Sequence, residues 1–428
     1  MDPVTAAQFI TMKDAFARQG INIEAAYRPN GALEYIYQVG RLLARTGNVA
    51  LLQERAASAG MQGLEVAGDD EQPGVSDLVV LSIDQASIGQ ADVGTMTVPL
   101  VLDFLDEQLP DNPGPVGGEP FVTPVHIMHI TKCCPAGEPE VPSGYPTGPW
   151  PPPNPAGGGA GVTIGLCDDG LQLGASATYA WMANVVPGSP ADIEIPGPTL
   201  PTGEQAIPKY AAHGTFGAGV AACMAPDATI IVNSHFTLAA AQIETVIAQK
   251  VEEMIQNHSP DVICLPAGTH TRNNWVNLGF NDFPIRHPDI PLVVSAGNDS
   301  HDTEFWPAAF EWAVAVGALG TDQRHRAWFS NYGSWVNVYA LGESIINAYT
   351  TGLYTYQEPP KQPAQQTFYG MARWDGTSFS APLVAGLIAA EMTASGISAQ
   401  DAKDAVLARA GAQEILGVGP AFPTPPFP

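Results

Sequence analysis

The sequence predicts an α/β fold in which a mostly parallel central sheet lies between helical layers, preceded by a small α+β unit. Two observations support this prediction. In the second part of the chain, short and nearly continuous apolar runs alternate with helical patterns, which is typical of parallel strands buried on both faces. A stretch rich in proline and glycine at 135–159 separates that part from the first 134 residues.

The region 1–134 predicts a small α+β unit that ends in a strand. Its patterns indicate a strand running into a helix at 32–44, a helix at 49–60, a strand at 77–83, a helix at 98–109 and a strand at 123–130. His126 and His129 lie three apart in the last strand and so point to opposite faces. We therefore expect them to be structural and not to share a metal ion.

The region 160–412 predicts the parallel sheet. Six apolar runs indicate its strands, at 161–169, 228–236, 261–268, 291–298, 312–319 and 335–342, and the pattern at 238–256 is helical. Residues 399–415 predict a closing helix, and 413–428 an extended tail. Because sites in such sheets form outside the carboxyl ends of the strands, the polar residues that follow each run are the ones to examine.

The composition restricts the classes of partner. The 428 residues include 43 acidic and 17 basic residues, for a net charge of -26. A surface this negative repels the phosphates of nucleic acids and anionic lipid, so neither is an expected partner. It favours cationic partners or substrates, although a solubility adaptation explains the same charge.

The cysteines and the first residues suggest a cytoplasmic protein. Five cysteines, an odd number, argue against a disulfide framework, and the adjacent Cys133 and Cys134 are poorly spaced for a tetrahedral metal site. The first thirty residues lack a secretory signal, and no window reaches the ~20 apolar residues of a membrane span. These features predict a soluble cytoplasmic protein if the sequence is complete, and they leave non-classical export open.

Four polar positions at strand ends and helix starts form a set that fits hydrolysis by a hydroxyl. Asp168 follows the run "VTIGLC", His213 opens "HGTFGAGV", Asn298 ends "VVSAGN", and Ser378 lies in "GTSFSAP". Such chemistry requires a nucleophile, a base, a carboxylate that orients the base and donors for the oxyanion. At a helix start, the backbone N–H of Ser378 and the helix dipole favour developing negative charge. Taken singly, Asp-Asp-Gly after a strand and the motif of Asn298 are usually turn chemistry, whereas Gly-Thr-Ser-Phe-Ser-Ala-Pro is the specific motif.

Together these motifs resemble those of the subtilisin-like serine proteases, the subtilases or peptidase family S8, over roughly residues 160–395. The resemblance implies that Asp168 orients, His213 is the base and Ser378 attacks, while Asn298 supplies an oxyanion-hole amide beside the Ser378 N–H. Asp169 replaces the Ser or Thr usual after the family's aspartate, so which carboxylate faces His213 stays open, with Asp168 favoured. The base must be neutral to act, so activity is expected to fall in acid.

The same resemblance suggests where the substrate binds. Two segments would form the sides of the P1 pocket, with Leu265, Pro266, Ala267 and Gly268 in one and Ser295, Ala296 and Gly297 in the other. The following loop carries three acidic residues, Asp299, Asp302 and Glu304, which suggests a preference for a basic P1 side chain; the alternative is that they are solvated or cap turns. No cofactor and no metal cage are expected, and a structural calcium site would be invisible in the sequence.

The first 134 residues fit the role of a propeptide that blocks the active site of its own chain. The strand at 123–130 is followed by residues 131–139, which would lie in the cleft as a product-like inhibitor, with a cut between about 128 and 150. The alternative is a permanent domain that recruits substrate. We therefore expect a serine endopeptidase made as a self-processed zymogen. A dedicated processing protease that cuts one partner or precursor peptide is the alternative, and a non-catalytic binding protein on the same scaffold is the remaining one.

Overall fold

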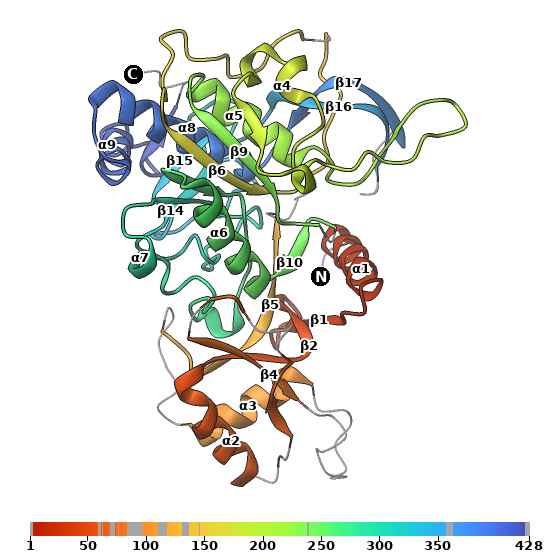
Figure 1. The fold of residues 1–428 in the computed structure, drawn as a ribbon, viewed down its shortest axis with the longest axis vertical. Coiled ribbons are helices and arrows are strands. Elements are labelled where there is room, and N and C mark those ends of the chain that lie inside the picture. Colours follow the sequence, from red (N-terminus) through yellow and green to blue (C-terminus); the bar gives the residue numbers. More distant parts are fainter. Residues whose placement is uncertain are drawn as a thin grey trace.

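The structure is a computed structural model of the 428-residue chain. It describes residues 3–58, 61, 63–68, 73–75, 77–83, 97–109, 118–130, 137–144, 146–237, 239–356 and 363–423. The chain forms two units, an N-terminal unit (described residues of 3–130) and a larger C-terminal unit (described residues of 137–423). They meet around strand β5 (Val122–Ile130), which runs from the N-terminal unit into the C-terminal one (Figure 1).

The C-terminal unit is built on an eight-stranded sheet of order β18-β15-β14-β13-β11-β6-β9-β7, in which all neighbours are parallel. Its strands are β6 (Thr163–Asp168), β7 (Val185–Pro187), β9 (Thr229–Ser234), β11 (Val262–Leu265), β13 (Leu292–Ser295), β14 (Val314–Leu319), β15 (Val338–Leu341) and β18 (Ala421–Phe422). Most strand residues are buried, as expected where helices cover both faces. The predicted α/β fold is confirmed.

Helices cover both faces of this sheet. They are α4 (Ala175–Thr178), α5 (His213–Met224), α6 (Glu244–His258), α7 (Phe283–Arg286), α8 (Thr377–Ser395) and α9 (Ala399–Gly411). Helices α5, α8 and α9 share one hydrophobic core with alternate strand residues such as Ile164 and Leu166. Helices α6 and α7 pack in a second core with the intervening residues, such as Cys167. The alternation follows from the two-residue repeat of a strand.

The N-terminal unit is an antiparallel sheet with three helices. Its elements are α1 (Pro3–Ala17), β1 (Ile23–Tyr27), β2 (Leu33–Arg45), α2 (Val49–Ser58), β3 (Leu64–Val66), β4 (Leu78–Ile83), α3 (Val98–Gln108) and β5. The sheet has the order β10-β5-β2-β4-β3, with β1 beside β2. The prediction that a strand runs into a helix within 32–44 is wrong, because the whole segment belongs to one long strand, β2. Helix α1 was not predicted from the sequence.

Two short strands of the C-terminal unit join this antiparallel sheet. Strand β10 (Ala241–Ile243) pairs with one edge of β5 in the register Ala241 to His129, and β12 (Ala267–Gly268) pairs with the other edge in the register Ala267 to Ile130. The helical pattern at 238–256 was therefore assigned too early in the chain, because β10 precedes α6. Strand β5 consequently lies between two strands that belong to the other unit.

The described part of the proline-rich connector packs against the C-terminal unit. It forms backbone hydrogen bonds with the hairpin of β16 (Ile345–Thr355) and β17 (Gln365–Trp374), and β8 (Ala206–Ile207) pairs with β16 in the same sheet. Glu140 forms a bridge with Arg373, and Trp150 forms one with Ile346. The described backbone of this connector, 137–144 and 146–159, thus has hydrogen-bond partners in the C-terminal unit at Glu140, Trp150 and Asn154.

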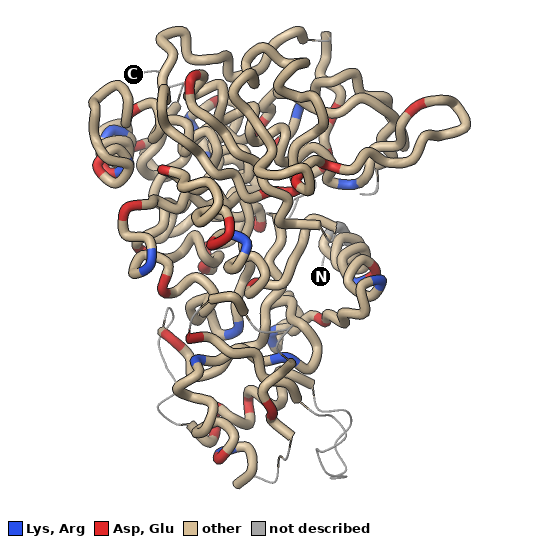
Figure 2. The backbone as a smooth tube through the Cα atoms, in the orientation of Figure 1, with Lys and Arg blue, Asp and Glu red and all other residues tan. Residues whose placement is uncertain are grey.

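The last described residues also differ from the expected tail, because β18 pairs in parallel with β15 and completes the sheet edge. Among the described residues, no single helix is long and apolar enough to cross a membrane, although the bent pair Thr377–Ser395 and Ala399–Gly411 passes by length and composition. Acidic positions are spread over both units and are not gathered on one face in this view (Figure 2).

Candidate active site

Asp168 and His213 meet at the carboxyl edge of the large sheet. Asp168 is the last residue of β6, and His213 is the first of α5. The His213 Nδ1 lies 2.8 Å from Asp168 Oδ1 and 3.0 Å from Oδ2, and both side chains are buried. Because Nδ1 faces a carboxylate, it carries the proton in the neutral ring, and Nε2 keeps its lone pair. Asp168, and not Asp169, is therefore the carboxylate that contacts this imidazole.

The His213 ring packs against the segment that carries Ser378. Its centroid lies 5.0 Å from that of Phe379, the next residue, and 5.4 Å from that of Trp374, at the end of β17. Ser378 is the second residue of α8 and is 2% exposed. The apolar rings exclude water from the imidazole, which strengthens its interaction with the carboxylate.

The backbone N of Ser378 and the side-chain N of Asn298 both lie close to Gly376. Gly376 has φ 154° and ψ 148°, directly before α8. A Cβ atom built on Gly376 would lie 3.6 Å from the Ser378 backbone N and 3.7 Å from Asn298 Nδ2. The Asn298 Oδ1 accepts hydrogen bonds from Thr377 N at 2.9 Å and Thr377 Oγ1 at 2.8 Å, which fixes the orientation of the amide. A side chain at position 376 would therefore contact both nitrogen atoms, and glycine leaves them uncovered on this side.

Two further carboxylates lie beside this site: Asp169, which the sequence analysis weighed against Asp168, and Glu194, which it did not identify. Asp169 accepts bonds from the amides of His213 and Gly214, and Glu194 accepts one from Ala212. Burial, Glu194 and Asp168 hold the pKa of Asp169 well above its usual range. Burial and Asp168 raise the pKa of Glu194 to about 7, although the Ala212 amide opposes this shift. Glu194 carried no sequence signal, because its contact depends on folding.

The residues expected to line the P1 pocket fall into two groups. Ala267 and Gly268 form β12 and pair with β5, while Leu265 is fully buried in the second core and Pro266 is buried between them. Ser295, Ala296 and Gly297 are buried at the end of β13, and Gly297 N donates to Thr377 Oγ1 at 3.2 Å. The first group contacts the N-terminal unit, and the second group contacts the start of α8.

The N-terminal unit is held by buried polar contacts as well as by strand pairing. The carboxylate of Glu244, at the start of α6, accepts bonds from the His126 backbone N at 2.9 Å and from Asn277 Nδ2. Its Oε1 also lies 3.2 Å from His126 Nδ1. Arg272, whose side chain is 6% exposed, binds Asp103 and Asp106 of α3 at 2.6 Å each. Buried charges are tolerated where they are paired in this way.

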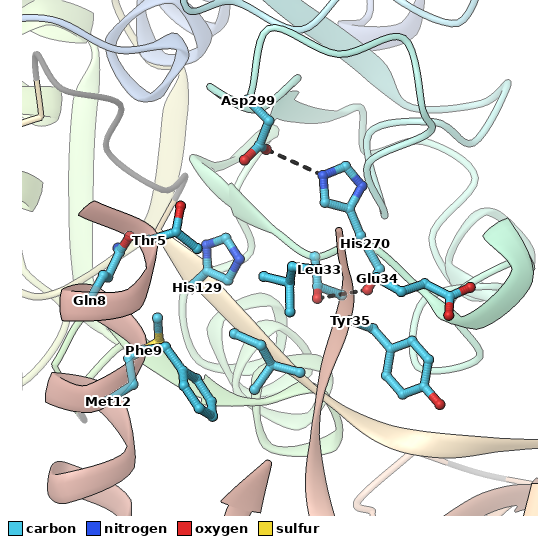
Figure 3. A pocket seen from close by; sticks show the side chains of 12 residues that line it. Thr5, Gln8, Phe9, Met12, Leu33, Glu34, Tyr35, His129, His270 and Asp299 are labelled. Atoms are coloured by element: carbon cyan, nitrogen blue, oxygen red, sulfur yellow. Dashed lines mark hydrogen bonds and ion pairs between the residues drawn. The ribbon is translucent and has the colours of Figure 1, made fainter. Parts of the chain in front are cut away.

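Figure 3 shows a small pocket between the N-terminal unit and the C-terminal unit. Thr5, Gln8, Phe9 and Met12 of α1, Leu33 to Ile36 of β2 and His129 of β5 face Thr269, His270 and Asp299 of the C-terminal unit. The space left between them is about 20 Å³, room for one water molecule. The two units therefore fit closely here.

Asp299, Asp302 and Glu304, the three acidic residues of the loop after Asn298, have different partners. His270 lies with Nε2 3.2 Å from Asp299 Oδ2 and with Nδ1 3.1 Å from the backbone O of Glu304. The side chain of Asp302 is exposed and lies 3.4 Å from His301 Nδ1. These contacts hold Asp299 against a histidine, and the preference for a basic P1 side chain stays a hypothesis.

Within the described residues, no group of three or more His, Cys, Asp or Glu side chains is arranged to hold a metal ion. His126 faces Glu244, whereas His129 Nδ1 contacts the Ile130 carbonyl at 3.2 Å, so the two histidines have separate partners. Cys167, Cys223 and Cys264 are buried free thiols. Cys133 and Cys134 lie outside the described residues, as do the other residues of 131–136, which were expected to enter the cleft.

Comparison with known proteins agrees with this architecture. The chain is 32% identical over 227 residues to the thermophilic serine proteinase of Bacillus sp. (strain AK1), covering 49% of each chain. It is 32% identical over 133 residues to subtilisin-like protease 1 of Trichophyton rubrum, covering 31% of this chain and 23% of that one. The chain thus spans about half or less of the length of these curated relatives.

A solved structure with a similar fold is that of fervidolysin from Fervidobacterium pennivorans, described as a keratinolytic enzyme related to subtilisin. It matches with a TM-score of 0.54 at 16% identity, covering 93% of this chain and 61% of the other. The model of the subtilase family matches residues 159–419, which is more than half of the 428 residues. The protein therefore belongs to the subtilase family.

Proposed function

We propose that this subtilase is a serine endopeptidase and that Ser378, His213 and Asp168 are its catalytic residues. The observation that supports this most strongly is the contact of Asp168 with His213 Nδ1. The same His213 ring packs on Phe379, the residue after Ser378. This contact leaves Nε2 as the basic nitrogen. His213 then takes the proton of Ser378 as Oγ attacks the carbonyl carbon of the substrate, and Asp168 stabilises the imidazolium that forms.

The remaining steps follow from the same groups. The negative oxygen of the tetrahedral intermediate accepts bonds from Ser378 N and Asn298 Nδ2. The imidazolium passes its proton to the leaving amine, the C–N bond breaks, and an ester on Ser378 remains. Water then attacks the ester with His213 again acting as base, and Ser378 regains its proton.

The proposal extends to the N-terminal unit, which we regard as an inhibitor of its own chain. Strand β5 occupies the edges of β10 and β12, where an extended polypeptide substrate would add as a strand. Both described residues that flank 131–136 are fixed to the C-terminal unit. Ile130 pairs with Ala267, and the Gly137 carbonyl accepts a bond from Trp374 Nε1 at 3.1 Å. We therefore expect the self-processing cut between residues 130 and 137.

Mass spectrometry of the purified wild type beside Ser378→Ala tests this proposal. We expect the wild type to separate into two fragments whose new ends lie between 130 and 137, and the variant to stay whole. A fluorophosphonate should label the wild type only, at Ser378. An unlabelled wild type would refute the catalytic assignment. A wild type that hydrolyses protein yet stays whole would refute processing and favour a permanent recruiting domain.

The range of substrates needs a separate measurement. We propose a general polypeptide substrate, with a basic P1 side chain as a further hypothesis. Digestion of casein and of a peptide library by the processed enzyme would test both. Cleavage of one precursor peptide with casein left intact would support a dedicated processing protease instead, and exclusively large apolar residues at P1 would refute the basic preference.

A further inference from the structure

The helix that carries His213 begins without a capping side chain of its own. Its N-cap residue is Ala212, which has φ 63° and ψ 17°. The first N–H groups of a helix have no partner within the helix, so partners must come from elsewhere. A polar N-cap side chain normally supplies one of them, and alanine has none.

Two carboxylates from a neighbouring segment supply these partners. Asp169 Oδ1 accepts a bond from Gly214 N at 2.7 Å, and its Oδ2 accepts one from His213 N at 3.3 Å. Glu194 Oε1 accepts a bond from Ala212 N at 2.8 Å. Three successive amides at the positive end of α5 thus donate to two acidic side chains, an arrangement that the helix dipole favours.

The two carboxylates share one rigid support. Leu171 and Ile193 form a parallel bridge, with Leu171 N bonded to Asp192 O and Glu194 N bonded to Leu171 O, each at 2.9 Å. Gly170 adopts φ 118°, and a Cβ there would lie 2.8 Å from the Asp192 carbonyl. Asp169 and Glu194 are therefore held at the two ends of a short backbone ladder, and neither depends on a mobile loop for its position.

We propose that Asp169 and Glu194 are positioning residues for His213. Asp168 holds the imidazole ring, while Asp169, the next residue, holds the backbone of the same histidine and Glu194 holds the residue before it. Together they fix the place of the imidazole, whose Nε2 is the basic nitrogen in the proposed function. This inference rests on the proposed function, in which His213 is the base. Misplacement of a catalytic group by about 1 Å can cost on the order of 10²-fold in rate.

The same arrangement links the position of the base to pH. Asp169 and Glu194 line a pocket of about 520 Å³ together with Arg18, which follows α1, and with Lys209 and Tyr210, which precede α5. The other titratable groups near them are Asp168 and Asp192, His213 itself and the buried Tyr349. Burial and Asp168 raise the pKa of Glu194 to about 7. A protonated carboxyl is the weaker acceptor, so the hold on Ala212 loosens as Glu194 gains a proton.

Fluorophosphonate labelling of Ser378 and peptide hydrolysis test this role, each measured from pH 5 to 9 on protein that was made as the full chain and allowed to process itself. We expect Asp169→Ala and Glu194→Ala to slow labelling and to lower kcat by about 10- to 100-fold, with KM nearly unchanged. Asp169→Asn and Glu194→Gln keep an oxygen acceptor but lose the negative charge, so they should recover only part of the rate. Asp227→Ala is the matched control, because Asp227 Oδ2 also accepts a backbone bond, from Gly158 N at 2.9 Å, in a different part of the unit.

The pH profile separates positioning from a merely structural role. As the pH falls, the labelling rate of the wild type should drop more steeply than the protonation of a single group would cause, because both His213 and Glu194 gain a proton. In Glu194→Gln the drop should have the slope expected for one proton. Alanine variants that label as fast as the Asp227→Ala control would overturn the inference and leave the proposed function intact. If an alanine variant fails to fold, Glu194→Gln still tests the inference: a pH dependence of labelling equal to that of the wild type would overturn it. Failure of the wild type to label, with Ser378→Ala as the blank, overturns both proposals.

Discussion

Substitution of Gly214 by alanine tests how tightly the start of α5 is fitted against the end of β6. A Cβ at position 214 would lie 2.5 Å from the Gly170 carbonyl oxygen, 2.9 Å from Asp169 Oδ1 and 3.0 Å from the Asp168 Cβ. An ordinary contact of this kind is about 3.4 Å or longer, so backbone must move by roughly 1 Å. Overpacking of this degree costs about 1–3 kcal/mol in stability. A 1 Å shift of the base costs on the order of 10²-fold in kcat/KM.

Gly217→Ala, one turn further along the same helix, is the matched control. Its Cβ would meet Leu166, Pro382 and Asp168 at 3.7–3.9 Å, which are ordinary contacts. Alanine is the better helix former by about 1 kcal/mol, so this variant should be as stable as the wild type or more stable. The assay is kcat/KM on a peptide substrate together with thermal unfolding. Equal activity in the two variants would refute the argument that contact with Asp168 and Asp169 positions the base.

Three further outcomes follow from the described contacts. Asn298→Ala should lower kcat by about 10²–10³-fold with little change in KM, measured by steady-state kinetics, and a change in KM alone would contradict an oxyanion role. Glu194 has a pKa raised from 4.5 to about 7, so the stability it contributes is complete below pH 4.5 and is lost as the pH rises through 7. Between pH 5 and 8, the free energy of unfolding of Glu194→Gln should therefore rise relative to that of the protein with Glu194, by at most about 3 kcal/mol. Urea unfolding measures this difference, with Ser378→Ala present in both proteins to prevent self-cleavage. A difference independent of pH would count against the shift. Arg272→Ala should loosen the N-terminal unit by about 1–3 kcal/mol, seen as faster limited proteolysis; Arg28→Ala, which removes one 3.3 Å contact with Asn274, should change it little.

The sequence was informative where the local pattern and the chemistry coincide. Nearly continuous apolar runs predicted the parallel strands, and each residue of the proposed site lies at a strand end or a helix start. The choice of Asp168 over Asp169 follows in the structure from its position as the last residue of β6, where its carboxylate reaches the His213 ring.

What the sequence did not give depends on contacts between distant segments. Strand β2 contains a helix-like stretch of apolar residues, but pairing with β4 and β5 on both sides keeps it extended. Strand β10 was hidden inside a helical pattern because its partner, β5, lies more than a hundred residues earlier. Glu194 is one acidic residue among 43, and only the fold brings its carboxylate to the amide of Ala212.

The double pairing of β5 has a consequence for what can take its place. Departure of the N-terminal unit would bare the backbone groups of β10 and β12 together, and both edges then lack hydrogen-bond partners. Only an uncoiled stretch of polypeptide can bridge the two edges at once, as β5 does. The backbone of β10 and β12 would accordingly bind unfolded or flexible segments in preference to compact proteins, whatever the side chains of those segments.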